Sequence, residues 1–253
     1  MNHIRHLLPT LMLALAACST PAPTPPGAAD AWQAVPLPGK PSTSYALSVK
    51  DGRPAVAAVS DKSASMWRRS LRVAAADLGE VSFSWWVPAP VAGAHVGESD
   101  KEDAAARVMF AFDGNIGSLP ARTRMLFDLA EALTGEQPPY ATLMYVWDSK
   151  ATVGSVITNP RTDRVRKIVV DSGSEQLGRW RDHRRDLAAD FRLAFGEEPG
   201  ALQSMALMTD SDNTRSQARA WYGAIRLLDR QAPGPAAIEP GATHSAPPSP
   251  AMP

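Results

Sequence analysis

The stretch Arg107-Val108-Met109-Phe110-Ala111-Phe112-Asp113 decides the fold of this chain, because strongly apolar side chains occupy every second position in it. Consecutive side chains of a β-strand point to opposite faces. The valine and both phenylalanines would therefore share one face, and the arginine, methionine, alanine and aspartate would share the other. We predict a strand whose first face packs into a core and whose second face carries polar chemistry.

Short segments of similar character surround this strand, and most of them follow one another without an intervening helix. Strand-like runs occupy residues 45–49, 55–59, 66–73, 81–87, 143–147, 155–158, 164–170, 203–209 and 218–228. Apolar residues recur at helical spacing in residues 121–133 and 187–195. Strands next to strands argue against a parallel α/β sheet. We expect a mainly β protein, built as an antiparallel β-sandwich with two inserted helices.

The beginning of the chain has the character of an export signal. Cys18 is the only cysteine and ends an apolar run that starts at Leu11, behind a basic start that carries Arg5. A positive start, an apolar stretch too short to span a bilayer and small residues before the cut are typical of such signals. Residues 15–18, Leu-Ala-Ala-Cys, also look like a lipobox, whose cysteine is lipidated and becomes the new N-terminus. We expect residues 1–17 to be a lipoprotein signal peptide; the alternative is a free thiol in an ordinary signal peptide or hydrophobic helix.

Lipidation of Cys18 would place the protein in the bacterial cell envelope, with the membrane as a partner through the lipid anchor. Ser19 rather than aspartate follows the cysteine. By resemblance to enterobacterial sorting rules, this indicates an outer membrane lipoprotein that faces the periplasm, with the inner membrane as the alternative.

Composition divides the rest of the chain. Residues 18–40 read as the lipidated cysteine with a Pro-rich linker, residues 41–230 as the β-sandwich domain, and residues 231–253 as a disordered Pro-rich tail. Lys and Arg together number 26, as do Asp and Glu, so the formal net charge is zero. Because such a chain lacks the basic footprint of a polyphosphate-binding protein, we expect no nucleic acid partner.

Many short motifs run in one order along residues 45–228. Among them are Asp103-Ala104-Ala105-Ala106-Arg107-Val108, Tyr145-Val146-Trp147, Leu177-Gly178-Arg179-Trp180, Met208-Thr209-Asp210-Ser211-Asp212-Asn213-Thr214 and Tyr222-Gly223-Ala224-Ile225. In these motifs the chain resembles the bacterial family known as domain of unknown function 3047, which implies an exported protein of unassigned activity. Residues 118–141 are longer than is usual for that family, and Ala224 replaces its typical acidic residue.

The final strand, residues 220–226, also looks like the closing strand of jelly-roll domains related to galactose-binding and carbohydrate-binding modules. We therefore expect the sandwich to be jelly-roll-like.

Ligand recognition would use the polar sheet face. Adjacent Trp85 and Trp86 must point to opposite faces, and by parity with the serines at positions 82 and 84 the second takes the polar one. Planar arginines and carboxylates beside aromatic rings are the groups that engage sugar hydroxyls and ring faces. The candidate binding residues are Trp86, Arg107, Asp113, Tyr145, Trp147 and Arg166.

Structural roles are the alternative for several of these residues. Trp86 could instead be partly buried under the helix at residues 121–133. Arg107 and Arg166 lie within predicted strands, where burial of a charge without a carboxylate is costly. Each arginine could therefore form an ion pair within the sandwich rather than contact a ligand.

A short polar segment offers a candidate metal site. Residues 210–214, Asp-Ser-Asp-Asn-Thr, bring hard oxygen ligands of the kind that Ca²⁺ takes to a strand end. The candidate ligands are Asp103, Asp210, Asp212 and Asn213. The glycine and distal glutamate of a helix-loop-helix calcium site are missing, and the alternative is an ordinary turn in which Asp and Asn bond their own backbone.

The sequence contains neither Gly-x-Ser-x-Gly nor His-Glu-x-x-His, so no catalytic motif favours an enzyme. We expect a lipid-anchored periplasmic domain that binds a saccharide or another envelope polymer. One alternative is a glycan-processing hydrolase that uses two of Asp103, Asp113, Asp210 and Asp212. The other is a structural envelope lipoprotein without a small ligand.

Overall fold

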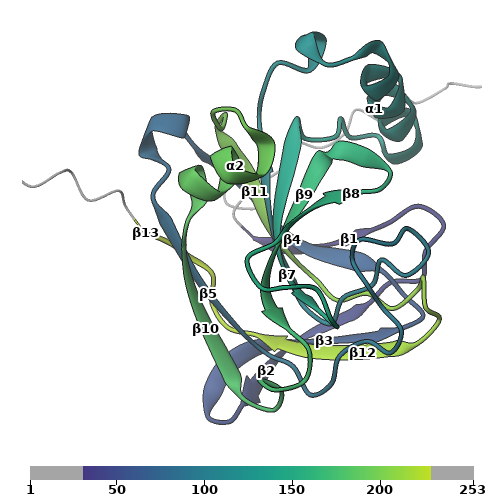
Figure 1. Ribbon diagram of the computed structural model, residues 1–253, viewed down its shortest axis with the longest axis vertical. Coiled ribbons are helices and arrows are strands. Elements are labelled where there is room, and N and C mark those ends of the chain that lie inside the picture. The colour runs from purple at the N-terminus through teal and green to yellow at the C-terminus, as the bar shows by residue number, and fades with distance from the viewer. Residues whose placement is uncertain (1–30, 229–253) are drawn as a thin grey trace, which may run out of the picture.

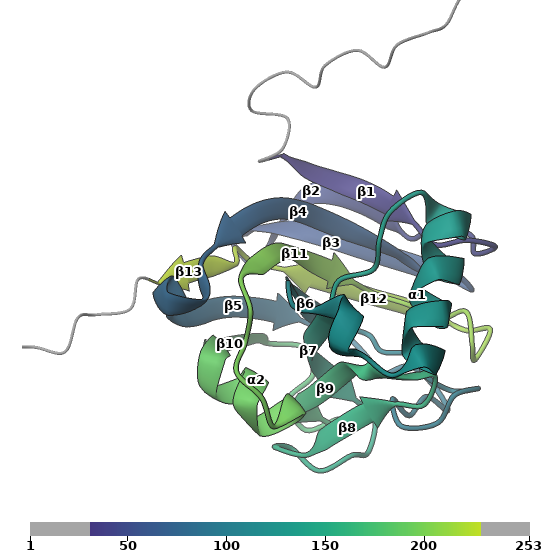
Figure 2. The same cartoon turned by 90° about the horizontal axis from the view of Figure 1, so that it is seen from above.

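The computed structural model describes residues 31–228, which fold as two β-sheets packed against each other (Figures 1 and 2). The larger sheet has seven strands in the order β1-β4-β11-β6-β7-β9-β8. These strands are β1 Trp32–Pro36, β4 Ser65–Val73, β6 Arg107–Phe112, β7 Ala141–Asp148, β8 Val156–Asn159, β9 Thr162–Ser172 and β11 Leu202–Met208.

The smaller sheet has six strands. Five follow the order β10-β5-β12-β3-β2, and β13 pairs with β5 beside that path. These strands are β2 Ser44–Lys50, β3 Arg53–Asp61, β5 Glu80–Trp86, β10 Trp180–Asp186, β12 Gln217–Tyr222 and β13 Arg226–Leu228.

Two α-helices lie outside the sheets, apart from each other in both views (Figures 1 and 2). They are α1, Ala121–Thr134, and α2, Leu187–Phe195; two short 3-10 turns, η1 Ala75–Asp77 and η2 Ile116–Ser118, complete the elements. The carboxylate of Asp186 caps α2 by accepting from the Ala189 N–H at 2.8 Å, and Gly196 ends the helix in the left-handed conformation. Among the described residues, no helix is long and apolar enough to cross a membrane.

The core lies between the two sheets, and the alternating stretch of β6 supplies its centre. Val108, Phe110 and Phe112 are completely buried, as their alternation predicts. Phe110 packs against Tyr145 at 5.9 Å between ring centroids, and Phe112 packs against Phe191 of α2 at 4.7 Å. Full burial of a side chain of this size contributes about 1.5–3 kcal/mol, so β6 fixes the larger sheet against both the core and α2.

The mainly β, jelly-roll-like sandwich with two helices is confirmed, and the bounds of three segments differ from the prediction. Residues 32–36, which we expected within the linker, form β1 at the edge of the larger sheet. Residues 180–186 form β10, which the sequence did not predict. The expected strand at residues 218–228 divides into β12 and β13.

One strand pair departs from the expected antiparallel arrangement. Strand β9 lies between β7 and β8 and runs parallel to β7. Strands β8 and β9 form an antiparallel hairpin, and β9, its second strand, folds back into the position between β8 and β7. The sheet is therefore mixed.

Candidate functional site

The outer face of the larger sheet, opposite the core, carries an open groove with a methionine floor. Met66, Met109 and Met144 come from β4, β6 and β7 and line a cavity of about 450 Å³. The groove is open there because Ala111 and Ala206, which also line it, have small side chains. This is the second face of the alternating stretch of β6, where Met109 and Ala111 point away from the buried phenylalanines.

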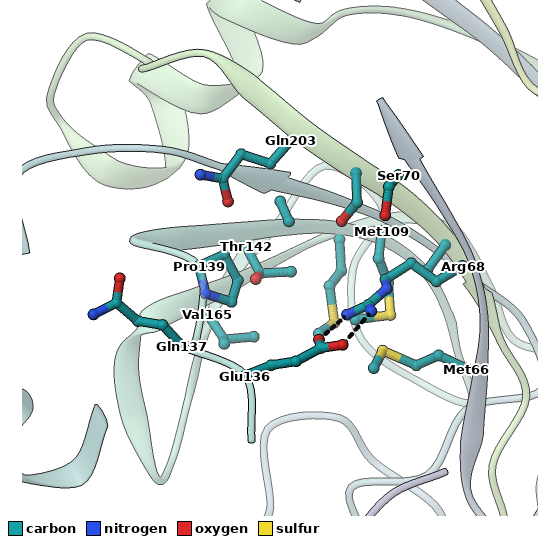
Figure 3. Close-up of a pocket in the computed structure, with 14 residues that line it drawn as sticks. Met66, Arg68, Ser70, Met109, Glu136, Gln137, Pro139, Thr142, Val165 and Gln203 are labelled. Atoms are coloured by element: carbon teal, nitrogen blue, oxygen red, sulfur yellow. Dashed lines mark hydrogen bonds and ion pairs between the residues drawn. The ribbon is translucent and has the colours of Figure 1, made fainter. Parts of the chain in front are cut away.

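A salt bridge crosses one side of the groove (Figure 3). Both terminal guanidinium nitrogens of Arg68 on β4 donate to the Glu136 carboxylate, at 2.8 and 3.0 Å. These hydrogen bonds from Arg68 lower the pKa of Glu136 below its ordinary value. Among the described residues that line the groove, Glu136 supplies the one carboxylate, and it is held ionised.

Other polar side chains around the opening remain available to a ligand. Ser70, Thr142 and Gln203 line the groove from three different strands (Figure 3). Within residues 31–228, no hydrogen bond engages these three side chains. Their hydroxyl and amide groups can therefore donate to, and accept from, a bound molecule.

The groove continues beyond Glu136 as a second cavity of about 530 Å³ between β1 and α1. Met66, Arg68 and Glu136 line both cavities, so the two are continuous. Leu133 of α1, whose exposed fraction is 67%, borders the second cavity. The groove is therefore long enough to extend from the sheet centre past the edge strand.

A comparison with models of protein families identifies the family of this chain. The model for "Protein of unknown function (DUF3047)" matches residues 30–226. The chain belongs to this family. No curated protein matches it. The solved xyloglucanase domain of NopAA, a type three effector from Sinorhizobium fredii in complex with cellobiose, is 8% identical with a TM-score of 0.39, covering 79% of this chain and 96% of that one.

None of the six predicted binding residues of this DUF3047 domain lines the groove. Arg107, expected on the open face, is only 2% exposed, and that expectation was wrong. Its guanidinium donates to both oxygens of Asp210, at 3.0 and 2.8 Å, and to the carbonyl of Glu102. The arginine lies at the end of β6, where the segments before β6 and after β11 cover it, so the alternative of a structural ion pair is confirmed.

Tyr145 and Trp147 lie on β7 with their rings in the core. The Tyr145 hydroxyl donates to Asp190 at 2.7 Å, and the Trp147 indole N–H donates to the Gly173 carbonyl at 3.1 Å. Both residues are almost completely buried. A contact with a ligand would require the sandwich to open.

Asp113 and Arg166 lie outside the groove as well. The Asp113 carboxylate is 3.5 Å from the Arg72 guanidinium, and both side chains are largely exposed. Arg166 donates to the carbonyl of Asp163 at 3.0 Å, and its guanidinium lies 5.7 Å from the centre of the Phe195 ring.

Trp86 lies on the outer face of the smaller sheet, as its parity predicts, beside two further tryptophans. Trp180 of β10 and Trp221 of β12 are its direct cross-strand neighbours. The Lys50 ammonium lies 3.8 Å from the centre of the Trp86 ring, so a cation rather than α1 partly covers it. Within the described residues, the buried indole N–H of Trp86 has no hydrogen-bond partner. The three tryptophans of this row are half-buried.

The candidate calcium ligands come together in space. One carboxylate oxygen from each of Asp103, Asp210 and Asp212 lies within 4.8 Å of the others. Each carboxylate already has a partner, however: Arg107 pairs with Asp210, Lys40 pairs with Asp212, and the Thr214 hydroxyl and N–H donate to Asp103 at 2.6 and 2.7 Å. Asn213 directs its amide to the Ser99 carbonyl. The donor set is therefore occupied by cations and donors of the protein, and it fits a metal poorly.

A buried charge cluster next to these residues was missed by the sequence analysis. The Lys167 ammonium, completely buried on β9, lies 2.6 Å from the Glu102 carboxylate and donates to the Val96 carbonyl at 2.7 Å. Burial, together with the nearby charge of Arg107, lowers the pKa of Lys167 to about 8. Burial also raises the pKa of Asp210 to about 6. Through these contacts the cluster connects the segment before β6, which carries Val96 and Glu102, to β9 of the larger sheet.

The groove residues Arg68, Glu136, Thr142 and Gln203 were also missed. A usable signal existed for part of the set, since Met66, Arg68 and Ser70 alternate along β4 as Met109 and Ala111 do along β6. Register between strands is not visible in the sequence, so this alternation alone could not bring the two strands together.

Proposed function

We propose that this DUF3047 domain binds a saccharide, or a related polyhydroxylated envelope polymer, in the groove on the outer face of its larger sheet. The observation that carries the proposal is the convergence of Ser70, Thr142 and Gln203, free of hydrogen bonds within the described residues, on one opening. A saccharide presents hydroxyl edges to such groups and apolar C–H faces to an apolar floor. The methionine floor supplies an adaptable surface of that kind.

The charges of the groove favour binding over hydrolysis. Glycosidic cleavage commonly uses two carboxyl groups, one of which must hold a proton and so needs a raised pKa. The Glu136 carboxylate has a lowered pKa because Arg68 donates to it. Asp103, Asp113, Asp210 and Asp212, the four candidates for a hydrolase, do not line the groove.

A glycan array with residues 19–253, which omit the expected signal peptide and Cys18, tests the proposal. Ala111→Trp fills the floor of the groove with a large ring, and we expect it to remove glycan retention. Thr142→Val keeps the side-chain shape but loses the hydroxyl, and should weaken binding by about 1 kcal/mol, or roughly fivefold.

Matched controls lie on the other sheet. Ala46→Trp places the same ring on the outer face of β2, and Trp86→Ala tests the tryptophan row. Both should retain the glycan. An array without any retained glycan, or binding that survives Ala111→Trp and is lost in Trp86→Ala, contradicts the groove.

We propose further that lipidation of Cys18 anchors the domain in the cell envelope as an outer membrane lipoprotein that faces the periplasm. Cys18 and the expected signal peptide lie outside the described residues, and support comes from the sequence motif. We expect Cys18→Ser to move the protein from the membrane fraction to the soluble fraction of lysed cells. Unchanged membrane fractionation of this variant contradicts the anchor.

A further inference from the structure

A separate opening lies between the two sheets, at the side of the molecule where β1, β2, β3 and β4 gather (Figure 2). It encloses about 480 Å³. Its walls are mainly apolar and include Trp32, Leu47, Val56 and Ile225. It shares none of its lining residues with the groove described above, because it opens onto the inner faces of the sheets.

One cation faces this opening. Arg69 on β4 has the same parity as Trp67 and Leu71, which pack against the core, so its side chain enters the space between the sheets. Its Nε atom is buried and has no hydrogen-bond partner in the described part of the chain. No ion pair within residues 31–228 involves Arg69, and no carboxylate lines the opening there.

The position of Arg69 favours the binding of an anion. A guanidinium keeps its charge in proteins, so it cannot escape the cost of desolvation by becoming neutral. A half-buried cation without a partner destabilises the free protein. Carboxylates and phosphates match the guanidinium fork with two parallel hydrogen bonds.

We propose that this opening binds an amphipathic oxyanion, meaning a carboxylate or phosphate monoester that carries an aliphatic tail. The anionic head pairs with Arg69, and the tail lies along Trp32, Val56 and Ile225. Leu47 is 90% exposed at the mouth of the opening, and a bound tail would cover it. The site is independent of the saccharide groove, and either can exist without the other.

Calorimetric titration of residues 19–253 with decanoate and with decyl phosphate tests this proposal and distinguishes the two head groups. Decyl maltoside has the same tail without the charge, whereas acetate and inorganic phosphate have the charge without the tail. We expect saturable binding of at least one charged amphiphile, and at least tenfold weaker binding of the neutral amphiphile and of the short anions.

Three variants locate the site. Arg69→Met removes the charge and keeps the length of the side chain, and should weaken binding at least tenfold. Ala224→Glu places a carboxylate on the wall of the same opening, where it can pair with Arg69 and exclude the ligand. Ala224→Gln adds the same volume without the charge, so it separates the effect of the carboxylate from that of the added bulk and should bind more tightly than Ala224→Glu.

Thermal unfolding separates ligand binding from a structural role of Arg69. We expect Arg69→Met to leave the melting temperature of the ligand-free protein unchanged or higher, because it removes an unpaired cation. The amphiphile should raise the melting temperature of the wild type only. A wild type that binds neither charged amphiphile, equal binding by Arg69→Met, or a ligand-free Arg69→Met that melts at a lower temperature overturns the proposal.

Discussion

The charged strand residue Arg107 contributes structure rather than recognition. Its ion pair with Asp210 is buried, and the partners hold each other in place: burial alone would lower the pKa of Arg107, yet the charges of Asp210 and Glu102 raise it. The sequence analysis could state that Arg107 needs a carboxylate. It could not single out Asp210 among the carboxylates of the chain, because only the folded strands bring β6 and the end of β11 together.

Removing one partner of this pair leaves an uncompensated buried charge. We expect Asp210→Ala to destabilise the domain by about 3–5 kcal/mol, measured as the shift in urea-induced unfolding. Asp113→Ala is the matched control, because the Arg72–Asp113 pair is exposed and contributes about 0–1 kcal/mol. Equal and small effects of the two substitutions would show that the buried pair has no special role.

Lys167 predicts how stability depends on pH in the alkaline range. Burial and the charge of Arg107 lower its pKa to about 8 in the folded protein, against 10.5 for an ordinary lysine. Between these values the unfolded chain binds more protons than the folded one, so stability rises with pH. We expect the free energy of unfolding to increase from pH 8 toward the ordinary pKa of tyrosine, where the buried tyrosines begin to oppose it.

Lys167→Met provides the comparison for this effect. The variant has no lysine to titrate at that position, so its stability should change less over the same pH range than that of the wild type. Parallel pH profiles for the two proteins would mean that Lys167 keeps an ordinary pKa.

At the scale of elements, the spacing of apolar residues predicted the type and the buried face of several strands and helices. The alternation in β5 and β6 and the helical spacing in α2 indicated the correct elements and the correct buried faces. The sequence did not predict strand β10, because its residues, WRDHRRD, include charged side chains where a core face would be expected. On this strand the Nε2 atom of His183 lies 2.8 Å from the Asp171 carboxylate, and the His183 side chain is only 10% exposed. The ring of His183 also stacks on Phe83 of β5, at 5.0 Å between centroids, so a polar side chain occupies a core position there.

The two faces of β6 should respond differently to substitution. Phe110→Ala empties part of the core and should cost about 3–5 kcal/mol. Ala111→Ser changes the groove face one residue away and should change stability by less than about 0.5 kcal/mol. Chemical denaturation of both variants measures the difference. A similar cost at the two positions would contradict the assignment of one packed and one open face.

At the scale of the whole molecule, the sandwich could be predicted, but the site could not. The groove joins side chains from β4, β6, β7, β9 and β11 with the segment after α1. These elements meet because of strand order, and strand order depends on contacts between distant residues that a single sequence does not display. On the face of β6 that was predicted to carry polar chemistry, Arg107 and Met109 are only 2% and 9% exposed, and none of the six residues assigned to recognition lines the groove.

The most direct measurement of the groove's role is methyl NMR of the chain labelled with ¹³C-methyl methionine, titrated with a glycan retained on the array. We predict that the methyl signals of Met66, Met109 and Met144 shift in proportion to bound glycan, while the signal of the core residue Met205 does not. Unshifted groove methionines, or a shift confined to the indole N–H of Trp86, would contradict the account.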